Sequence, residues 1–334
     1  MSVRDLLIVG AGPSGLSAAI AAKQRDLDYQ VLEQGVLVNS IYRFPPQMVF
    51  FTTPELLEIG GLPFVSPYEK PTRAEALNYY RKVVEKYDLQ ISYGETVLAV
   101  HREDDAFAIE TRTSRGVQRA RHARNVLMAI GYYDHPNLIG VPGEDLPHVH
   151  HYYSEPHAYF HRRVVIVGGG NSAAEASLEC FRAGARVTLV HRGPELKASI
   201  KYWVKPDIEN RIKEGSVAAR FNTCVTEIAP TSVVVRTVEP GNDTRNEELP
   251  ADAVLLLTGY RSDSNLLRAA GIHLNERCVP TLNPETFETN VPGLFLAGGA
   301  VTGMDTSNIF IENGRFHGEK IVQVIADRLM RDVR

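Results

Sequence analysis

Short apolar runs set between glycines dominate the first part of the sequence. Leu6 to Val9 is an uninterrupted apolar run, Leu16 to Lys23 is rich in small residues, and Tyr29 to Leu32 is a second apolar run. Apolar runs of this length between turn residues are typical of strands buried on both faces, and the segment between them is long enough for a helix. The pattern therefore predicts a strand, a helix and a second strand at the start of the chain.

Periodic segments continue beyond a turn-rich stretch. Thr72-Arg-Ala-Glu has the spacing of a capping box, and apolar residues follow at helical spacing as far as Val84. Three short strands are expected next, at Ile91 to Tyr93, Thr96 to His101 and Ala106 to Thr111. The basic stretch from Arg112 to Arg124, with Gly116 at its tip, predicts a hairpin whose charges lie on a solvated edge.

Aromatic and turn-forming residues fill the stretch from Asn39 to Thr53. The consecutive Pro45 and Pro46 exclude a helix there, because proline lacks an amide donor and clashes with the preceding turn. Two interpretations of the stretch stay open. It is a long loop that wraps around an extended ligand, or its aromatic side chains are ordinary anchors in the core.

The hydrophobic pattern then repeats itself. Asn125 to Tyr132 and Asp252 to Tyr260 are two apolar runs that both end in Gly-Tyr. Further elements are expected as a strand from Arg163, a helix from about Ser172 to Ala183, a strand from Arg186 to Val190, a strand ending at Gly298 and a long helix from near Ser307. The repeat indicates an internal duplication, and the alternation of strands and helices predicts an α/β fold with two Rossmann-like three-layer domains.

Length, composition and charge narrow the class of protein. A chain of 334 residues suffices for two domains, and 44% hydrophobic with 23% charged residues is ordinary for a globular protein. The formal net charge of -4 leaves no excess of cations for nucleic-acid phosphates. No apolar run approaches the roughly 20 residues that span a bilayer, and no signal-peptide pattern is visible. We therefore expect no nucleic-acid partner, no membrane and a cytoplasmic location.

The first predicted strand meets Gly10, Gly12 and Gly15 in the G-x-G-x-x-G spacing, and the second ends in Glu33. In such a turn the first glycine permits the bend, the second lets the backbone approach a pyrophosphate, and the third lets the helix pack closely. The helix N-terminus attracts phosphate, and the acid binds ribose hydroxyls. Because all these parts have their expected separations, the stretch is predicted to bind an adenine dinucleotide.

The repeat carries a second fingerprint. Residues 168–173, Gly-Gly-Gly-Asn-Ser-Ala, have the G-x-G-x-x-A spacing, but His191-Arg192 stands where the first copy has its acid. A cation suits the 2'-phosphate of NADP, which an acid would repel, and Lys197 is close enough in sequence to contribute. We therefore assign FAD to the first fingerprint and NADPH, the hydride donor, to the second. The predicted domains are residues 1–134 and 261–334 for FAD, and an inserted domain of residues 135–260 for NADPH.

The whole chain resembles the low-molecular-weight thioredoxin-reductase-like flavoproteins, and most of all the bacillithiol disulfide reductases, also called bacilliredoxin reductases. The matching stretches are Leu37-Val-Asn-Ser-Ile-Tyr, Glu55-Leu-Leu-Glu-Ile-Gly, Gly131-Tyr-Tyr-Asp, Gly168-Gly-Gly-Asn-Ser-Ala, Ser199-Ile-Lys-Tyr-Trp-Val and Ile309-Phe-Ile-Glu-Asn-Gly-Arg-Phe-His-Gly. The resemblance implies an FAD enzyme that uses NADPH to reduce the disulfide of a low-molecular-weight thiol or of a small redoxin partner. It also implies a homodimer, since dimers are common in this superfamily.

The fingerprints and the resemblance together assign the site residues. FAD is expected at Gly10, Gly12, Pro13, Ser14, Gly15, Glu33, Gln34, Asn39, Val97, Ala129, Gly131, Gly298, Asn308 and Ile309. NADPH is expected at Gly168, Gly170, Asn171, Ser172, Ala173, Glu175, His191, Arg192 and Lys197. By analogy Glu175 lies near the nicotinamide amide. The resemblance places His317 near the flavin ring, where a histidine can protonate a leaving thiolate; a packed helix histidine is the alternative.

Three positions depart from the pattern of these relatives. Thioredoxin reductases have C-x-x-C just before the second fingerprint, where this chain has no cysteine. Family members often carry a cysteine in the first glycine turn, where Ser14 stands here, and a hydroxyl forms no mixed disulfide. The usual acid after the last Ala-Gly is replaced by Gly299. The flavin is therefore expected to act directly on an outside acceptor, or through a cysteine elsewhere.

The cysteines and histidines are the remaining candidates for a disulfide or a metal site. Cys180, Cys224 and Cys278 form no C-x-x-C and are expected to be small buried apolar residues. A dense group of histidines precedes the second fingerprint, at His148, His150, His151, His157 and His161. The last two are expected to share one face of a helix. No Cys, Asp or Glu stands at ligand spacing beside the group, so we expect a partly exposed hinge loop and no metal.

Other functions of the same superfamily stay open. A ferredoxin-NADP reductase also lacks C-x-x-C, but usually extends over its flavin beyond the last helix, within or just after which this chain stops at Arg334. A flavin monooxygenase shares both fingerprints, yet its F-x-G-x-x-x-H signature is not matched before Arg163. A non-enzymatic flavoprotein that senses NADPH is the third alternative.

Overall fold

The computed structural model describes residues 3–239, 241, 243–306 and 308–332. Contacts divide the chain into two compact units. Unit 1 consists of residues 1–135 and 260–334, and unit 2 of residues 136–259. These divisions lie one residue away from the domain boundaries expected from the sequence.

Unit 1 is built on one sheet, and every strand expected in it is present. Within the described residues the order is β3-β2-β1-β6-β5-β4, and β17 also pairs with β6. The strands are β1 (Arg4–Val9), β2 (Tyr29–Glu33), β3 (Ile91–Tyr93), β4 (Glu95–Glu103), β5 (Ala106–Thr113), β6 (Gln118–Met128) and β17 (Leu294–Leu296). The pairs that involve β1, β2, β3 and β17 are parallel, whereas β4, β5 and β6 pair antiparallel.

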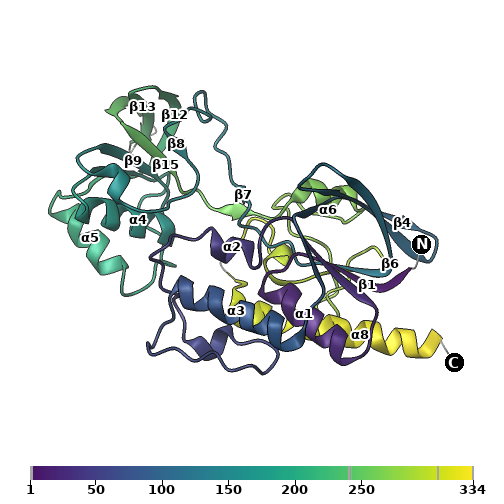
Figure 1. The fold of residues 1–334 in the computed structure, drawn as a ribbon. Coiled ribbons are helices and arrows are strands. Elements are labelled where there is room, and N and C mark those ends of the chain that lie inside the picture. The colour runs from purple at the N-terminus through teal and green to yellow at the C-terminus, as the bar shows by residue number, and fades with distance from the viewer. Residues whose placement is uncertain (1–2, 240, 242, 307, 333–334) are drawn as a thin grey trace. The chain divides into compact units, whose positions relative to one another are not determined.

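Both faces of this sheet are covered, which gives unit 1 three layers. Helices α1 (Pro13–Gln24), α3 (Arg73–Tyr87) and α8 (His317–Asp332) lie on one side (Figure 1). Leu6 and Ile8 of β1 belong to the apolar cluster on that side, whereas Leu7 and Val9 belong to a second cluster with residues of β4 to β6 and of α6 (Ser264–Ala269). Alternate side chains of a strand point to opposite faces, so the uninterrupted run at Leu6 to Val9 is explained by burial on both sides.

Unit 2 repeats the plan with a fully parallel sheet of order β11-β10-β9-β15-β8 among the described residues. Its strands are β8 (Val149–His150), β9 (Arg163–Val167), β10 (Arg186–Val190), β11 (Ala218–Arg220) and β15 (Ala253–Leu256). The flanking elements are α4 (Asn171–Arg182), α5 (Lys205–Lys213) and the antiparallel strands β12 (Thr223–Ala229), β13 (Ser232–Val238) and β14 (Thr244–Pro250). Ile166 packs with the helices and Val165 with the antiparallel strands, so this sheet too is the middle of three layers.

The remaining elements are short: α2 (Asn39–Tyr42), α7 (Ile311–Gly314), the paired β7 (His135–Pro136) and β16 (Tyr260–Arg261), and the 3-10 turns η1 (Pro54–Leu57), η2 (His157–Tyr159) and η3 (Gly298–Val301). The exclusion of a helix from residues 39–53 is wrong for the first residues, because α2 forms one helical turn that ends before Pro45. Phe50 is buried and Phe44 packs edge-on against it, with ring centroids 6.4 Å apart. These two aromatic side chains are core anchors, as the second interpretation proposed.

The expected long C-terminal helix is divided into two. Ser307 lies outside the described residues, α7 begins only at Ile311, and α8 begins at His317. The Asn313 side chain accepts the Phe310 N–H at 2.9 Å and so closes the start of α7. The Gly314 carbonyl accepts the Ser14 hydroxyl at 3.0 Å. The first contact is a local cap, whereas the second joins residues far apart in the sequence.

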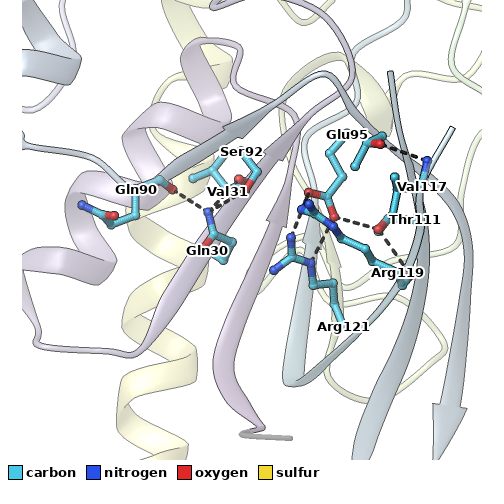
Figure 2. A network of polar contacts seen from close by, with 10 residues as sticks. Gln30, Val31, Gln90, Ser92, Glu95, Thr111, Val117, Arg119 and Arg121 are labelled. Atoms are coloured by element: carbon cyan, nitrogen blue, oxygen red, sulfur yellow. Dashed lines mark hydrogen bonds and ion pairs between the residues drawn. The ribbon is translucent and has the colours of Figure 1, made fainter. Parts of the chain in front are cut away.

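The hairpin predicted around Gly116 is confirmed, but two of its charges are not simply solvated. Glu95 at the start of β4 is only 2% exposed and accepts hydrogen bonds from Arg121 at 2.9 and 3.0 Å and from Thr111 at 2.7 Å, with Arg119 at 3.4 Å (Figure 2). Burial opposes ionisation of this carboxyl, but the hydrogen bonds from Arg121 and Thr111 outweigh it and lower its pKa. The arginines thus neutralise a buried acid within the sheet.

Two further expectations from the sequence are wrong. Only Cys180 is buried; Cys224 is exposed on β12, where buried and exposed residues alternate, and Cys278 is partly exposed in a turn. His157 and His161 share no helix, because η2 ends at Tyr159 and His161 has a positive φ of 58°. Cys224 is exposed because its side chain points out of a regular strand, whereas at His161 the backbone leaves the helical path.

Candidate functional site

The first glycine turn joins β1 to α1 at the carboxyl edge of the parallel strands. Gly10 has a φ of 103°, and a Cβ added there would lie 2.5 Å from the Ala129 carbonyl oxygen. A Cβ on Gly15 would lie 2.0 Å from the Gly10 carbonyl oxygen, whereas Gly12 faces open space. Packing therefore demands the first and third glycines, and the second leaves room beside the N-terminus of α1, where a phosphate is favoured.

Glu33 at the end of β2 stabilises this turn through hydrogen bonds to its backbone. The carboxyl group is 5% exposed and accepts the Ala11 N–H and the Gly35 N–H, each at 2.8 Å. Burial raises its pKa, and the two backbone hydrogen bonds oppose that shift. Each carboxyl oxygen has a second acceptor site, so the group still fits ribose hydroxyls.

The other residues expected at FAD end the neighbouring strands or follow them. Ala129 comes directly after β6, and its N–H donates to the Val9 carbonyl at 2.8 Å, while Gly131 faces open space and its carbonyl accepts the Ser262 hydroxyl at 2.8 Å. Around them lie Gln34, which donates to Asp134 at 3.0 Å, Asn39, which packs on Gly35, and Val97, at a register shift of β4. Because the carboxyl ends of parallel strands share one edge, the fold brings the turn, Glu33, Ala129 and Gly131 together.

Ser14 links the turn to the C-terminal helices. Its hydroxyl donates to the Gly314 carbonyl, and a Cβ added to Gly298 would lie 2.4 Å from its oxygen. Gly298 follows β17, and its N–H donates to His317 Nδ1 at 3.2 Å. Asn308 and Ile309 lie just ahead of α7 in the sequence. Asn308 is exposed and Ile309 is half-buried. The position between Pro13 and Gly15 is thus a packing contact as well as part of the turn.

His317, at the start of α8, is buried. Burial, reinforced by Lys320, lowers its pKa to about 4, and its ring stacks on Phe287 with centroids 4.1 Å apart. The ring is thus packed and its Nδ1 is bonded to Gly298, which favours the alternative interpretation. The role as proton donor stays a prediction.

Tyr132 was missed by sequence reasoning. A Cβ added to Gly299, where the resemblance led us to expect an acid, would lie 2.4 Å from the Tyr132 ring. Burial raises the pKa of this phenol, so it stays neutral. The aromatic ring thus fills the place of the missing acidic side chain. The only sequence signal was the unusual Gly-Gly after β17 together with a Tyr after Gly131.

The second glycine turn, between β9 and α4, has the same construction. A Cβ on Gly168 would lie 2.5 Å from the Leu257 carbonyl oxygen, and Gly170 faces open space in front of the helix. Ala173, 1% exposed, takes the third position. The turn therefore leaves room for a pyrophosphate at the same place as the first one does.

The residues after β10 include a buried histidine, which packs on the glycine turn, and two exposed cations. His191 is 8% exposed, and its ring lies 2.3 Å from the place of a Cβ on Gly169. Burial, with Lys197 and Arg192 nearby, lowers its pKa and keeps it neutral. Arg192 and Lys197 are exposed. The positive charge at this edge thus comes from Arg192 and Lys197, and His191 shapes the turn.

The start of α4 contains three more of the expected residues. Asn171 uses its side chain within the protein, since Nδ2 donates to the Ser199 carbonyl at 3.2 Å and Oδ1 accepts the Lys201 N–H at 2.9 Å. Ser172 is exposed. Glu175 is half-buried, and burial together with Glu179 raises its pKa to about 7. The backbone of Asn171 and Ser172 thus stays available to a phosphate.

No metal site accompanies these turns in the part of the chain that the structure describes, since no three His, Cys, Asp or Glu side chains gather there. In the histidine loop, His151 Nε2 lies 3.8 Å from Glu144 Oε1, and Glu144 accepts the N–H groups of Ile139 and Gly140. Over the same described residues, no helix is both long and apolar enough to cross a membrane.

Comparisons with known proteins place this architecture in a family. A profile of pyridine nucleotide-disulphide oxidoreductases matches residues 7–298. Bacilliredoxin reductase Bdr of Bacillus subtilis (strain 168) is 43% identical over 324 residues, which cover 96% of this chain and 97% of that protein. Solved structures of the bacillithiol disulfide reductase Bdr are similar too. The Bacillus cereus enzyme has a TM-score of 0.93 and 38% identity over 98% of this chain and 100% of its own.

The Bdr structure from Staphylococcus aureus has a TM-score of 0.90 and 38% identity, and covers 98% of this chain and 99% of its own. Both matches extend over the two glycine turns and over the strands and helices that carry them. The likeness therefore concerns the whole architecture and not one domain of it. The chain belongs to the bacilliredoxin reductase family of pyridine nucleotide-disulphide oxidoreductases, and it is a flavin-dependent oxidoreductase.

Proposed function

We propose that the protein is an NADPH-dependent FAD oxidoreductase that reduces a low-molecular-weight disulfide of the bacillithiol type, or the disulfide of a small redoxin partner. One observation carries the proposal: two glycine turns face open space in front of a helix, one closed by a buried acid and the other by exposed cations. The similarity to the bacilliredoxin reductase supports the disulfide as substrate.

Unit 1 has the features that FAD requires. The N-terminus of α1 and the space at Gly12 would hold the pyrophosphate, and Glu33 would hold the adenosine ribose. Gly131, Gly298 and the backbone at Asn308 and Ile309 border the remaining length of the cofactor. When bound, FAD supplies a ring that takes up a hydride and releases two electrons to a disulfide.

Unit 2 has the features that NADPH requires. The space at Gly170 and the N-terminus of α4 would hold the pyrophosphate, while Arg192 and Lys197 bind the 2'-phosphate. Glu175 lies one turn along α4, with a carboxyl that is partly protonated at neutral pH. Such a carboxyl can either donate to an amide oxygen or accept from an amide nitrogen, which suits a carboxamide ligand.

The substrate disulfide is reduced without an enzyme thiol at the first turn. The Ser14 hydroxyl is engaged with Gly314, and burial followed by Glu179 raises the pKa of the Cys180 thiol to about 12. The net reaction is NADPH + H⁺ + RSSR → NADP⁺ + 2 RSH, in which NADPH is oxidised and the S–S bond breaks. The protein's residues bind and align the partners, and the first turn offers no thiol for a mixed disulfide.

NADPH oxidation by the purified protein tests this function. We would compare four acceptors: oxygen alone, a bacillithiol-type disulfide, the disulfide of a redoxin, and ferredoxin. Stoichiometric thiol release, two thiols for each NADPH, with one of the disulfides is the expected result. Turnover with oxygen that no disulfide accelerates would contradict the proposal and indicate an oxidase or monooxygenase.

A ferredoxin-NADP reductase is the second candidate, because an acceptor of single electrons needs no thiol beside the flavin. The serine at position 14 is the observation that favours it. Ferredoxin reduction that is faster than any disulfide reduction at equal acceptor concentration would select this function.

A further inference from the structure

Two adjacent aromatic side chains protrude from unit 2 close to its glycine turn. Tyr202 is 81% exposed and Trp203 is 40% exposed, and their rings meet edge to face with centroids 4.8 Å apart. They lie between β10 and α5, on a segment from which the proposed function uses only Lys197. We call residues 196–204 the strap.

The strap is fixed to the turn at two places. The Lys197 N–H donates to the Gly169 carbonyl at 3.0 Å, and the two hydrogen bonds of the Asn171 side chain hold the backbone at Ser199 and Lys201. The apolar residues Leu196, Ile200 and Val204 are 3%, 4% and 8% exposed and anchor the strap in the core of unit 2. Tyr202 therefore follows directly after a residue that is bonded to the first residue of α4, and its exposure is not the result of a loose loop.

Sheet order tells which half of a dinucleotide the strap faces. From β9 the order continues to β10 and β11 on one side and to β15 on the other. The adenosine half belongs on the β10 side, because Arg192 and Lys197 follow β10. The strap leads from those cations to α5, which packs beside α4, so it too lies on the adenosine side.

We propose that Tyr202 is a coenzyme contact whose ring covers the adenosine half of NADPH, and that Asn171 is a positioning residue that holds the strap in place for it. A tyrosine face offers stacking area to a base with little loss of conformational freedom, which explains why so large a ring stays exposed in the free protein. The inference rests on the proposed use of NADPH and adds the residues that bind its adenosine half.

Half-coenzymes separate this inference from the proposed function. Adenosine 2',5'-bisphosphate contains the adenosine half, and reduced nicotinamide mononucleotide contains the other half. With the FAD-loaded protein, Tyr202→Ala should weaken binding of NADPH and of the bisphosphate by the same factor, about ten-fold or more. Flavin reduction by the mononucleotide should be unchanged. Tyr202→Phe should behave like the wild type, because the ring and not the hydroxyl makes the contact.

Trp203 offers a readout that does not depend on activity, since it is the only tryptophan in the chain. Its emission should change when the bisphosphate is added, because the base is placed against the ring that touches Trp203. Asn171→Ala should alter this emission already in the free protein and weaken the bisphosphate, since the strap loses both side-chain hydrogen bonds. Tyr68→Ala is the matched control, because it removes a 62% exposed tyrosine from unit 1 and should change neither quantity.

Three outcomes of these binding experiments would contradict the inference. If the wild type binds the bisphosphate and takes electrons from NADPH, but Tyr202→Ala does both equally well, the inference is overturned while the proposed function stands. If Tyr202→Ala weakens the mononucleotide and not the bisphosphate, the ring lies on the nicotinamide side and the assignment is wrong. If the wild type binds NADH and NADPH equally and the bisphosphate not at all, NADPH use and the inference both fail.

Discussion

The two glycine turns have the same spacing, yet they are held together by different residues. In unit 1 the helix lies so close that a Cβ on Gly15 would come within 2.0 Å of the Gly10 carbonyl oxygen, whereas in unit 2 Ala173 occupies the corresponding position. In unit 1 Glu33, the last residue of β2, is buried in the turn. In unit 2 the corresponding residue, His191, is buried against the turn, and the cation beside it, Arg192, is exposed. The charged side chain is thus also the buried one in unit 1, whereas two neighbouring residues divide these features in unit 2.

The largest effect is expected from the third position of each turn. Gly15→Ala should prevent the close approach of α1, lower the free energy of unfolding by about 3 kcal/mol or more and abolish flavin binding. Ala173→Gly should lower it by only about 1 kcal/mol, the usual loss for glycine in a helix. Flavin absorbance and thermal unfolding measure both. A Gly15→Ala protein with full flavin content would show that the turns do not differ in this way.

The acid and the cation that close the turns give the next contrast. Glu33→Ala leaves the amides of Ala11 and Gly35 without their acceptor in a buried place, so we expect a loss of about 2–4 kcal/mol in the free energy of unfolding. Glu33→Gln keeps one acceptor oxygen and should lie between that variant and the wild type. Arg192→Ala should change stability by less than about 0.5 kcal/mol, because the side chain is exposed.

Urea unfolding of the three proteins, with and without added FAD, measures this contrast. An Arg192→Ala protein as unstable as Glu33→Ala would mean that the cation, too, is part of its turn.

Of the four residues substituted in these predictions, only Arg192 is expected to affect the preference for NADPH over NADH. Arg192→Glu should weaken NADPH by about 2–3 kcal/mol, roughly 30- to 150-fold, because a charge-assisted bond to the 2'-phosphate becomes a repulsion. NADH, which lacks that phosphate, should bind nearly as before. Arg186→Glu makes the same charge change on an exposed residue at the opposite end of β10 and should alter neither affinity. Equal weakening of both coenzymes in Arg192→Glu would remove the NADPH assignment.

The parts of both turns that could be predicted are those fixed by local spacing. Strand, glycines and helix lie within about 20 residues of one another, and the capping box at Thr72 is closed by Glu75 three residues later, with the Thr72 N–H donating to its carboxyl at 2.8 Å. Such signals depend on backbone geometry over one or two turns, which the sequence states directly.

The parts that could not be predicted join residues far apart in the sequence. Ser14 and Gly314 are 300 positions apart. The ring of Tyr132, which follows β6, lies against Gly299, which follows the neighbouring β17. The burial of His317 and the hydrogen bond that it accepts from Gly298 likewise depend on residues distant in the sequence. Burial and long-range packing determine the role of a polar residue, and the spacing of a motif does not predict either of them.

The smallest expected effect is on the pH dependence of the free energy of unfolding. It concerns Glu33 and Glu175, two carboxyl groups whose pKa values are raised but whose hydrogen-bond partners differ. Glu33 accepts two backbone hydrogen bonds, whereas Glu175 accepts none from the described residues, and its pKa is raised to about 7 by burial and by Glu179. The unfolded chain loses this proton near pH 4.5, so the folded state binds more protons between pH 4.5 and 7. The free energy of unfolding should therefore fall as the pH rises through this window.

Glu175→Gln has no such proton to lose, so its unfolding free energy should stay flatter from pH 4.5 to 7 and exceed that of the wild type by about 1 kcal/mol at pH 8, discounted for partial exposure. Urea unfolding followed through Trp203 reports on unit 2 alone, since no other tryptophan is present. Glu179→Gln removes the neighbouring charge and should shift the window to lower pH. An unaltered pH profile in Glu175→Gln would assign the proton to another group, and the two units would then no longer differ in how they accommodate a buried acid.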